Sequence, residues 1–182
     1  MADSRSAPMR LVLAATAGAA LLSAGAAPAR AEEQTVKAFS VWQVAGQLVQ
    51  TGEKQATFTG VLAGPVYVET DRGPVLAGAL SCPASVDIQL DSGRQQATAR
   101  CAFQAGDDSR LYGELTCQGM HLIGCDGAFA ISGGTGRFAG AQGDGPVMVR
   151  GDFRRVALRA DGSLEESVAG IIYWPALRYT LP

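Results

Sequence analysis

The sequence is poor in the residues that common catalytic and metal sites require. Its single histidine, His121, is accompanied by no Cys-x-x-Cys pair, which argues against a structural zinc site. No Gly-x-Ser-x-Gly occurs, which disfavours a serine hydrolase. No Gly-Lys-Ser/Thr follows the glycine-rich stretch, which excludes a P-loop. We therefore predict no metal and no cofactor, and we favour a non-catalytic role while leaving enzymatic activity open.

Long apolar runs are missing except near the N-terminus. Residues 11–22 form an apolar run that is too short to span a bilayer of about 30 Å. Arginines precede this run, and small residues in Ala-x-Ala spacing follow it. The pattern predicts a secretory signal peptide over 1–31 and one periplasmic or secreted domain over 32–182, with no membrane insertion after cleavage. The lack of an Arg-Arg pair ahead of the apolar run favours the general export route, and the lack of a cysteine at the cleavage site argues against a lipid anchor.

Basic residues are in short supply once the signal peptide is removed. The remaining chain holds 12 basic and 16 acidic side chains, a net charge of −4. Nucleic acids and anionic lipids need a basic face, so neither is expected as a partner. The acidic pairs Asp107-Asp108 and Glu165-Glu166 are interpreted as solvated turns and strand faces.

Helical periodicity is almost absent, and a β pattern takes its place. Short runs rich in Val, Thr, Phe and Tyr alternate with turn residues. The runs predict strands at 36–49, 55–62, 65–70, 74–81, 85–90, 95–104, 110–118, 124–131, 136–150, 152–159 and 164–173. Many short strands at even spacing indicate an all-β antiparallel barrel or a sandwich.

The four cysteines all lie in the predicted mature chain, and an even count in an exported protein favours disulfides. A two-residue turn at Ser92-Gly93 would place Ile88 opposite Ala97 and Ala84 opposite Cys101. In that register Cys82 and Cys101 are diagonal neighbours. If residues 120–123 form the next loop, Cys117 lies directly opposite Cys125, within reach of a bridge. We predict the pairs Cys117–Cys125 and, less directly, Cys82–Cys101.

The most distinctive stretch runs from Ile131 to Gly145 and contains Gly-Gly-Thr-Gly-Arg-Phe-Ala-Gly-Ala-Gln-Gly. Part of it fits a loose dinucleotide-binding pattern, but the following glycines cannot start the helix which that pattern requires. The stretch resembles the late-barrel motif of the allene oxide cyclase and dirigent proteins and their bacterial relatives. The resemblance implies an antiparallel barrel of about eight strands, often assembled as a trimer. It leaves activity open.

One face of the central strands is polar and supplies candidate site residues. Arg100, Tyr112, Glu114 and Asp126 would line a lumen, with Glu114 or Asp126 as acid or base, if this face points inward. The favoured alternative is the solvated outside of the sheet, where Arg100 could pair with Glu114. Two further candidates lie elsewhere: His121, a possible base beside the Cys117–Cys125 bridge or an exposed turn residue, and Trp42, a possible lumen aromatic.

Three functions fit these observations. The favoured one is a barrel that binds a small apolar ligand, or serves in assembly, without catalysis. The alternatives are a cyclase or isomerase of the allene oxide cyclase type and a dirigent-like protein that orients a substrate. The apolar C-terminal tail, residues 171–182, is expected to pack on the barrel or on another subunit of a homo-oligomer.

Overall fold

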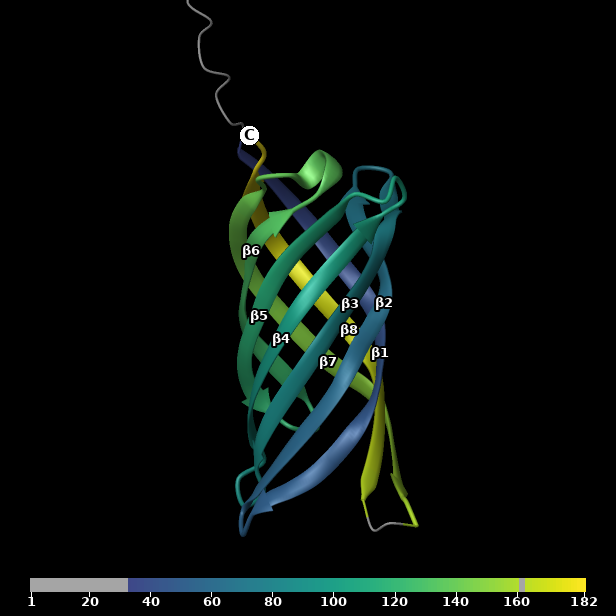
Figure 1. The fold of residues 1–182 in the computed structure, drawn as a ribbon, viewed down its shortest axis with the longest axis vertical. Coiled ribbons are helices and arrows are strands. Elements are labelled where there is room, and N and C mark those ends of the chain that lie inside the picture. Colours follow the sequence, from purple (N-terminus) through teal and green to yellow (C-terminus); the bar gives the residue numbers. More distant parts are fainter. Residues whose placement is uncertain (1–32, 161–162) are drawn as a thin grey trace, which may run out of the picture.

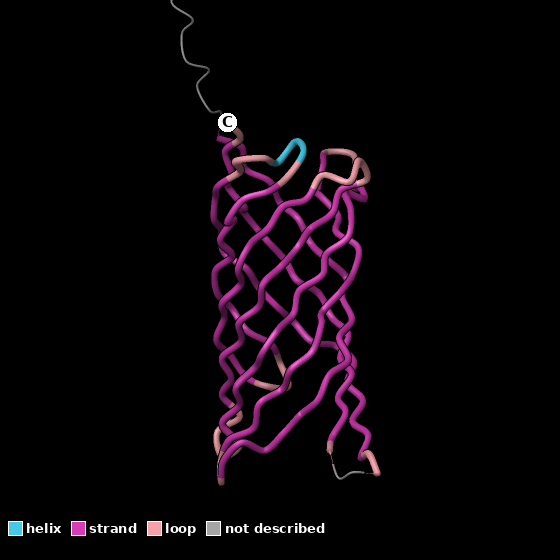
Figure 2. The backbone as a smooth tube through the Cα atoms, viewed as in Figure 1, coloured by secondary structure: helices cyan, strands magenta, loops and turns pink. Residues whose placement is uncertain are grey.

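The computed structural model describes residues 33–160 and 163–182, and the predicted signal peptide lies outside them. Every strand pairs antiparallel with the next along the chain, and the last pairs with the first, which closes a barrel (Figure 1). The strands are β1 (Glu33–Gly52), β2 (Gln55–Thr70), β3 (Gly73–Gln89), β4 (Arg94–Ala105), β5 (Arg110–Met120), β6 (Gly124–Gly134), β7 (Gln142–Leu158) and β8 (Leu164–Thr180). The predicted all-β antiparallel barrel of eight strands is therefore confirmed. Strand dominates the described chain, apart from turns and one short helical segment (Figure 2).

The strands are fewer and longer than those expected from the sequence. The runs 55–62 and 65–70 are one strand, β2, and the runs 74–81 and 85–90 are another, β3. Pro83 does not divide β3, because it pairs with Val61 where the β2–β3 ladder is continuous, and the proline interrupts only the β3–β4 ladder. Proline has no N–H to donate to a ladder. It is tolerated in a strand where its nitrogen faces a neighbour with which no ladder hydrogen bond is formed.

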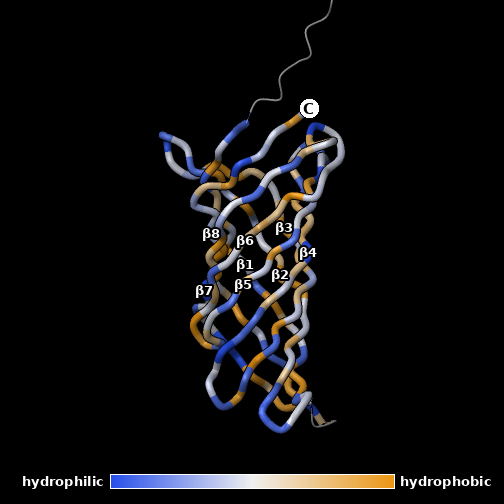
Figure 3. The backbone as a smooth tube through the Cα atoms, turned by 90° about the vertical axis from the view of Figure 1, so that its left-hand side faces the viewer, coloured by the Kyte–Doolittle hydropathy of each residue, from blue (hydrophilic) through white to orange (hydrophobic). Residues whose placement is uncertain are grey.

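Hydrophobic and hydrophilic residues alternate along the strands (Figure 3). The buried set is mainly apolar, so the apolar face of each strand points into the barrel. On β1, for example, Trp42 and Val44 are buried, whereas Val41 and Gln43 are exposed. On β3 to β5 the polar face points to solvent, as the favoured interpretation held. Arg100 pairs with Glu114 across the β4–β5 ladder on that outer face, with Nε and Oε1 3.4 Å apart.

The register between β3 and β4 differs from the expected one by two residues. Ile88 lies opposite Gln95 and Ala84 opposite Ala99, because residues 90–93 form a four-residue connection. A shift by two residues preserves the faces, so the apolar set still points inward. It brings Cys82 and Cys101, expected as diagonal neighbours, directly opposite each other, with their Cα atoms 4.1 Å apart.

Both predicted disulfides are present, but their geometries are exchanged. Cys117 lies opposite Gly127, and Cys125 lies opposite Gly119, so the Cys117–Cys125 bridge is the diagonal one, with Cα atoms 5.5 Å apart. The two glycines have no side chain to obstruct that diagonal path. All four cysteines are buried and point into the lumen. Two disulfides are consistent with an oxidising compartment.

The barrel has two distinct ends. The upper end in Figure 1 carries the β2–β3, β4–β5 and β6–β7 connections and the C-terminus, and the lower end carries the other four connections. The glycine-rich motif lies at the upper end, where residues 136–141, expected as strand, form the 3₁₀ helix η1 (Gly136–Phe138) and a short loop. Gly136 has φ of 61°, and a Cβ there would collide with Ser109 Oγ, which accepts a hydrogen bond from the Arg137 N–H at 3.1 Å. Glycine is the residue that fits this position.

Candidate functional site

The lumen contains two separate cavities, one toward each end of the barrel. On β1, Ala38 lines the upper cavity and Trp42 lines the lower one. Ser40, between them in the chain, is fully buried and lines neither. Phe129 and Trp174 pack edge to face, with ring centres 5.7 Å apart, at the inner boundary of the upper cavity. The closed barrel therefore offers two distinct interior sites.

The upper cavity has a volume of about 360 Å³ and almost entirely apolar walls. Its lining includes Val66, Leu80, Phe103, Leu111, Ile131 and Trp174. Phe138 of the glycine-rich motif closes over it and packs edge to face on Phe103, with ring centres 6.0 Å apart. The motif thus forms part of the wall of this cavity.

Polar groups of the upper cavity are concentrated near the motif. Arg137 lies over the Phe138 ring, 4.9 Å from its centre, and pairs with Asp107 at 3.5 Å. The Ser109 N–H donates to Asp107 Oδ1 at 3.2 Å and, together with the Arg137 charge, lowers the pKa of that carboxyl. Tyr179 donates its hydroxyl to Gln34 Oε1 at 2.6 Å.

The lower cavity, of about 110 Å³, holds a cluster of three ionisable side chains from three different elements. Glu166 of β8 is 2% exposed, and its Oε1 lies 2.6 Å from Arg154 Nε of β7. Arg154 Nη1 lies 3.1 Å from His121 Nε2, in the β5–β6 connection. The same His121 nitrogen is 4.0 Å from Glu166 Oε1. We call these residues the lower triad.

Burial shifts the pKa values of His121 and Glu166 in opposite directions. Burial, reinforced by the charge of Arg154, lowers the pKa of His121 to about 4. Burial raises the pKa of Glu166, and Arg154 opposes that rise. A neutral His121 can accept the Arg154 hydrogen bond at Nε2, which places its own proton on Nδ1. Glu166 Oε2 has no hydrogen-bond partner among the described residues.

A β-bulge accounts for the position of Arg154. Gly151 lies opposite Gly170, but Phe153 lies opposite Ala169, so Asp152 is an extra residue in β7. The insertion reverses the alternation and turns Arg154 into the lumen. Glu166 points into the lumen without a bulge, because it lies an even number of residues from the inward-facing Val168 and Ile172 of β8.

Glu166 corrects the interpretation of Glu165-Glu166 as a solvated pair. Glu165 faces outward and pairs with Arg159, whereas Glu166 is buried in the lumen. Sequence reasoning missed both partners of His121. Glu166 alternates in step with the apolar residues of β8, and this spacing could have predicted that it points into the barrel. Nothing in the local sequence pattern predicts the bulge before Arg154.

The structure separates the candidate residues into two groups. His121 and Trp42 both line the lower cavity. Arg100, Tyr112, Glu114 and Asp126 lie on the exposed outer face.

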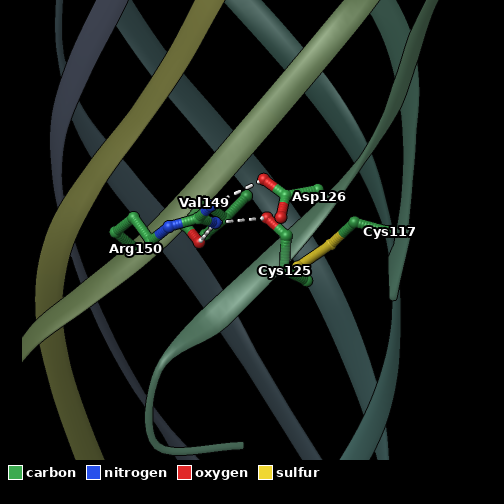
Figure 4. Close-up of polar contacts among 5 residues, drawn as sticks. All are labelled: Cys117, Cys125, Asp126, Val149 and Arg150. Atoms are coloured by element: carbon green, nitrogen blue, oxygen red, sulfur yellow. Dashed lines mark hydrogen bonds and ion pairs between the residues drawn. A yellow bond between two sulfur atoms is a disulfide. The ribbon is translucent and has the colours of Figure 1, made fainter. Parts of the chain in front are cut away.

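Asp126 has a defined partner on that outer face. Arg150 Nη2 donates to Asp126 Oδ1 at 2.7 Å, and its Nη1 donates to the carbonyls of Cys125 and Val149 (Figure 4). The arginine therefore ties the carboxylate to the edge of the β6–β7 ladder, beside the Cys117–Cys125 bridge (Figure 4). Within residues 33–160 and 163–182, no group of three or more His, Cys, Asp or Glu side chains is placed to hold a metal ion.

No family model matches the chain, and no curated protein matches it. Among solved structures it is similar to the pterocarpan synthase dirigent protein GePTS1, with 15% sequence identity and a TM-score of 0.30. The match covers 85% of this chain and 99% of that one. This similarity carries no argument about activity, and the fold rests on the strand pairing of the chain itself. No helix in the described part of the chain is long and apolar enough to cross a membrane.

Proposed function

We propose that this protein binds a small apolar molecule in the upper cavity of the barrel and holds it without transforming it. The observation that carries the proposal is a cavity of about 360 Å³, open at the upper end of the barrel, with aliphatic and aromatic walls. Cavities of this size and character bind small ligands through the burial of apolar surface. Among the described residues that line it there is no carboxylate, histidine or cysteine to act as acid, base or nucleophile.

A role in orienting a bound substrate is the second candidate. Arg137 is the charged group in a largely apolar wall, and it pairs with Asp107 at 3.5 Å. A ligand with one polar end would be held in a single direction by such a group. Orientation of this kind needs no reacting side chain.

Binding can be tested with the neutral fluorophore N-phenyl-1-naphthylamine. We expect its emission to rise on binding, and Ala38→Leu, which fills part of the upper cavity, to weaken binding severalfold. Ala63→Leu adds the same atoms on the outer face of β2 and is the matched control. Equal affinity in all three proteins would refute binding in this cavity. Native mass spectrometry of the protein from its own source would then identify the natural ligand and show whether it is unchanged.

We also propose that the protein is exported and forms a homo-oligomer. Two disulfides support an oxidising compartment. An apolar patch on the outer face of β8, β1 and β2 supports self-association: Phe39 stacks on Tyr67 at 5.2 Å, and Val41 and Ile171 are about half exposed.

The association can be measured by light scattering. We expect Val41→Arg to lower the mass, whereas the control Gln96→Arg, on the outer face of β4, leaves it unchanged. A wild-type protein that is monomeric at tens of micromolar would refute self-association.

A further inference from the structure

We propose that the lower cavity is a second ligand site, which takes a small neutral apolar molecule bearing one hydroxyl group that donates a hydrogen bond to Glu166 Oε2. This site is separate from the upper cavity, so the proposal does not depend on the function proposed above.

The buried carboxylate is the main reason for the assignment. Glu166 is 2% exposed and lines the cavity, and its Oε2 has no hydrogen-bond partner among the described residues. An unpaired oxygen of a buried carboxylate is costly, since it has lost water without gaining a donor. A ligand that brings one donor to this oxygen would remove that cost.

The neighbours of Glu166 select the chemical class of the ligand. Arg154 already balances the carboxylate charge, with Nε 2.6 Å from Oε1, and His121 is neutral at pH 7 because burial lowers its pKa to about 4. A cationic ligand would leave a net positive charge in an apolar cavity, and an anionic ligand would face the Glu166 carboxylate. A neutral hydroxyl supplies the missing donor without adding charge.

The rest of the cavity sets the size and polarity of the ligand body. The walls are mostly apolar. They include Trp42, Phe58, Leu115 and the disulfide between Cys117 and Cys125. The volume of about 110 Å³ is smaller than the apolar cavity of about 150 Å³ that accepts benzene, so a single six-membered ring is the upper limit for the body of the ligand.

The opening of the lower cavity is lined by apolar side chains, which suits the entry of an apolar ligand. Leu122 and Ile123, which follow His121 in the β5–β6 connection, line the cavity and are 73% and 63% exposed. The β6–β7 ladder ends at the Gly124–Arg150 pair, and the Gly151 N–H then donates to the Ile123 carbonyl at 3.3 Å, so the β5–β6 connection continues the barrel wall on that side. A small molecule would enter past these two side chains.

The experiment compares phenol with toluene, which has the same number of heavy atoms but no donor. His121 is the only histidine, so its imidazole resonances report on the lower cavity alone. We expect phenol at pH 7 to shift them and to bind about tenfold more tightly than toluene, as a hydrogen bond to a charged acceptor implies. The Trp174 indole resonance, from the upper cavity, serves as the internal comparison.

The double variant Arg154→Met, Glu166→Leu is the decisive control. It removes both charges together. Proteins commonly tolerate the replacement of a whole buried ion pair by apolar residues, so the barrel is expected to fold. We expect its preference for phenol to disappear. Phenol that moves Trp174 but not His121, a preference retained by the double variant, or tighter binding of benzylammonium than of phenol would each overturn the proposal. None of these outcomes bears on binding of the naphthylamine in the upper cavity.

Discussion

The single histidine, His121, is expected to reduce the stability of the barrel in acid. Folding lowers the pKa of His121 from 6.5 to about 4, chiefly because burial disfavours its charged form. Above pH 6.5 the imidazole is neutral in both the folded and the unfolded chain and makes no contribution to the pH dependence. As the pH falls from 6.5 to 4, the unfolded chain takes up the proton first, so stability is lost in this window.

The magnitude follows from the size of the pKa change. One pKa unit corresponds to about 1.4 kcal/mol, so the fall from 6.5 to about 4 predicts a loss of about 3 kcal/mol once the pH is below 4. Glu166 acts in the opposite direction, because its raised pKa lets the folded chain bind a proton before the unfolded chain does. The difference between two proteins that share Glu166 isolates the contribution of His121.

His121→Gln is the appropriate comparison. Glutamine does not titrate, yet its carbonyl oxygen can still accept the hydrogen bond that Arg154 donates to His121. Urea unfolding of both proteins, with disulfides intact, would be measured at pH 7 and at pH 4. We expect the wild type to lose about 3 kcal/mol more than the variant over this interval.

The pKa can also be read directly from the imidazole resonances of the folded protein during an acid titration. A midpoint near 4, together with the expected difference in stability, would support the burial and charge argument. A midpoint at or above 6, or equal losses of stability in the two proteins, would refute it.

Three further predictions concern stability and can be checked by urea unfolding. Gly136→Ala should cost about 1–3 kcal/mol, because it forces a side chain onto a positive φ against Ser109, whereas Gly106→Ala, where an added Cβ meets nothing, should be nearly neutral; equal effects would contradict the steric argument. Replacing Cys82 and Cys101 by alanine should cost about 3 kcal/mol, and replacing Cys117 and Cys125 about 2.5 kcal/mol, since the loops span 19 and 8 residues; the reverse order would show that loop length does not govern the effect. Glu114→Gln, in the exposed pair with Arg100, should cost at most about 1 kcal/mol, and a larger loss would mean that the pair does more than its exposure allows.

The architecture and the orientation of the central strands were predictable from alternation. On β3, Val86 and Ile88 alternate with Asp87 and Gln89, and a barrel with an apolar core leaves one orientation for such a strand. The number of strands was harder to predict, because proline and glycine usually end strands but here lie within long ones. Pro83 shows why: only one of its two neighbouring ladders is interrupted.

Register was predictable only up to a shift of two residues. Such a shift leaves every side chain on the same face, so alternation cannot detect it. The length of each connection fixes the register: the four residues of the β3–β4 connection place Cys82 directly opposite Cys101, and the β5–β6 connection makes Cys117 and Cys125 diagonal neighbours.

The lower triad could not be predicted from the alternation of residues along single strands. Reading the alternation of β7 forward from Val147 and Val149 assigns Arg154 to the outer face. The single extra residue Asp152 reverses that assignment. His121 was identified as a candidate without its partners, because Arg154 and Glu166 lie 33 and 45 residues away from it in the sequence.

The order of the strands has a consequence for how this barrel is made. Seven of its eight ladders join strands that follow each other in the chain, so they can form as hairpins soon after each strand is synthesised. The eighth joins Glu33 to Thr180, almost the full length of the described chain. Until β8 has been released, β1 and β7 each present a long unpaired edge, and the apolar lumen stays open to one side. The final seventeen-residue strand therefore changes an aggregation-prone open sheet into a closed structure without edges, and loss of that strand should be far more damaging than its share of the core implies.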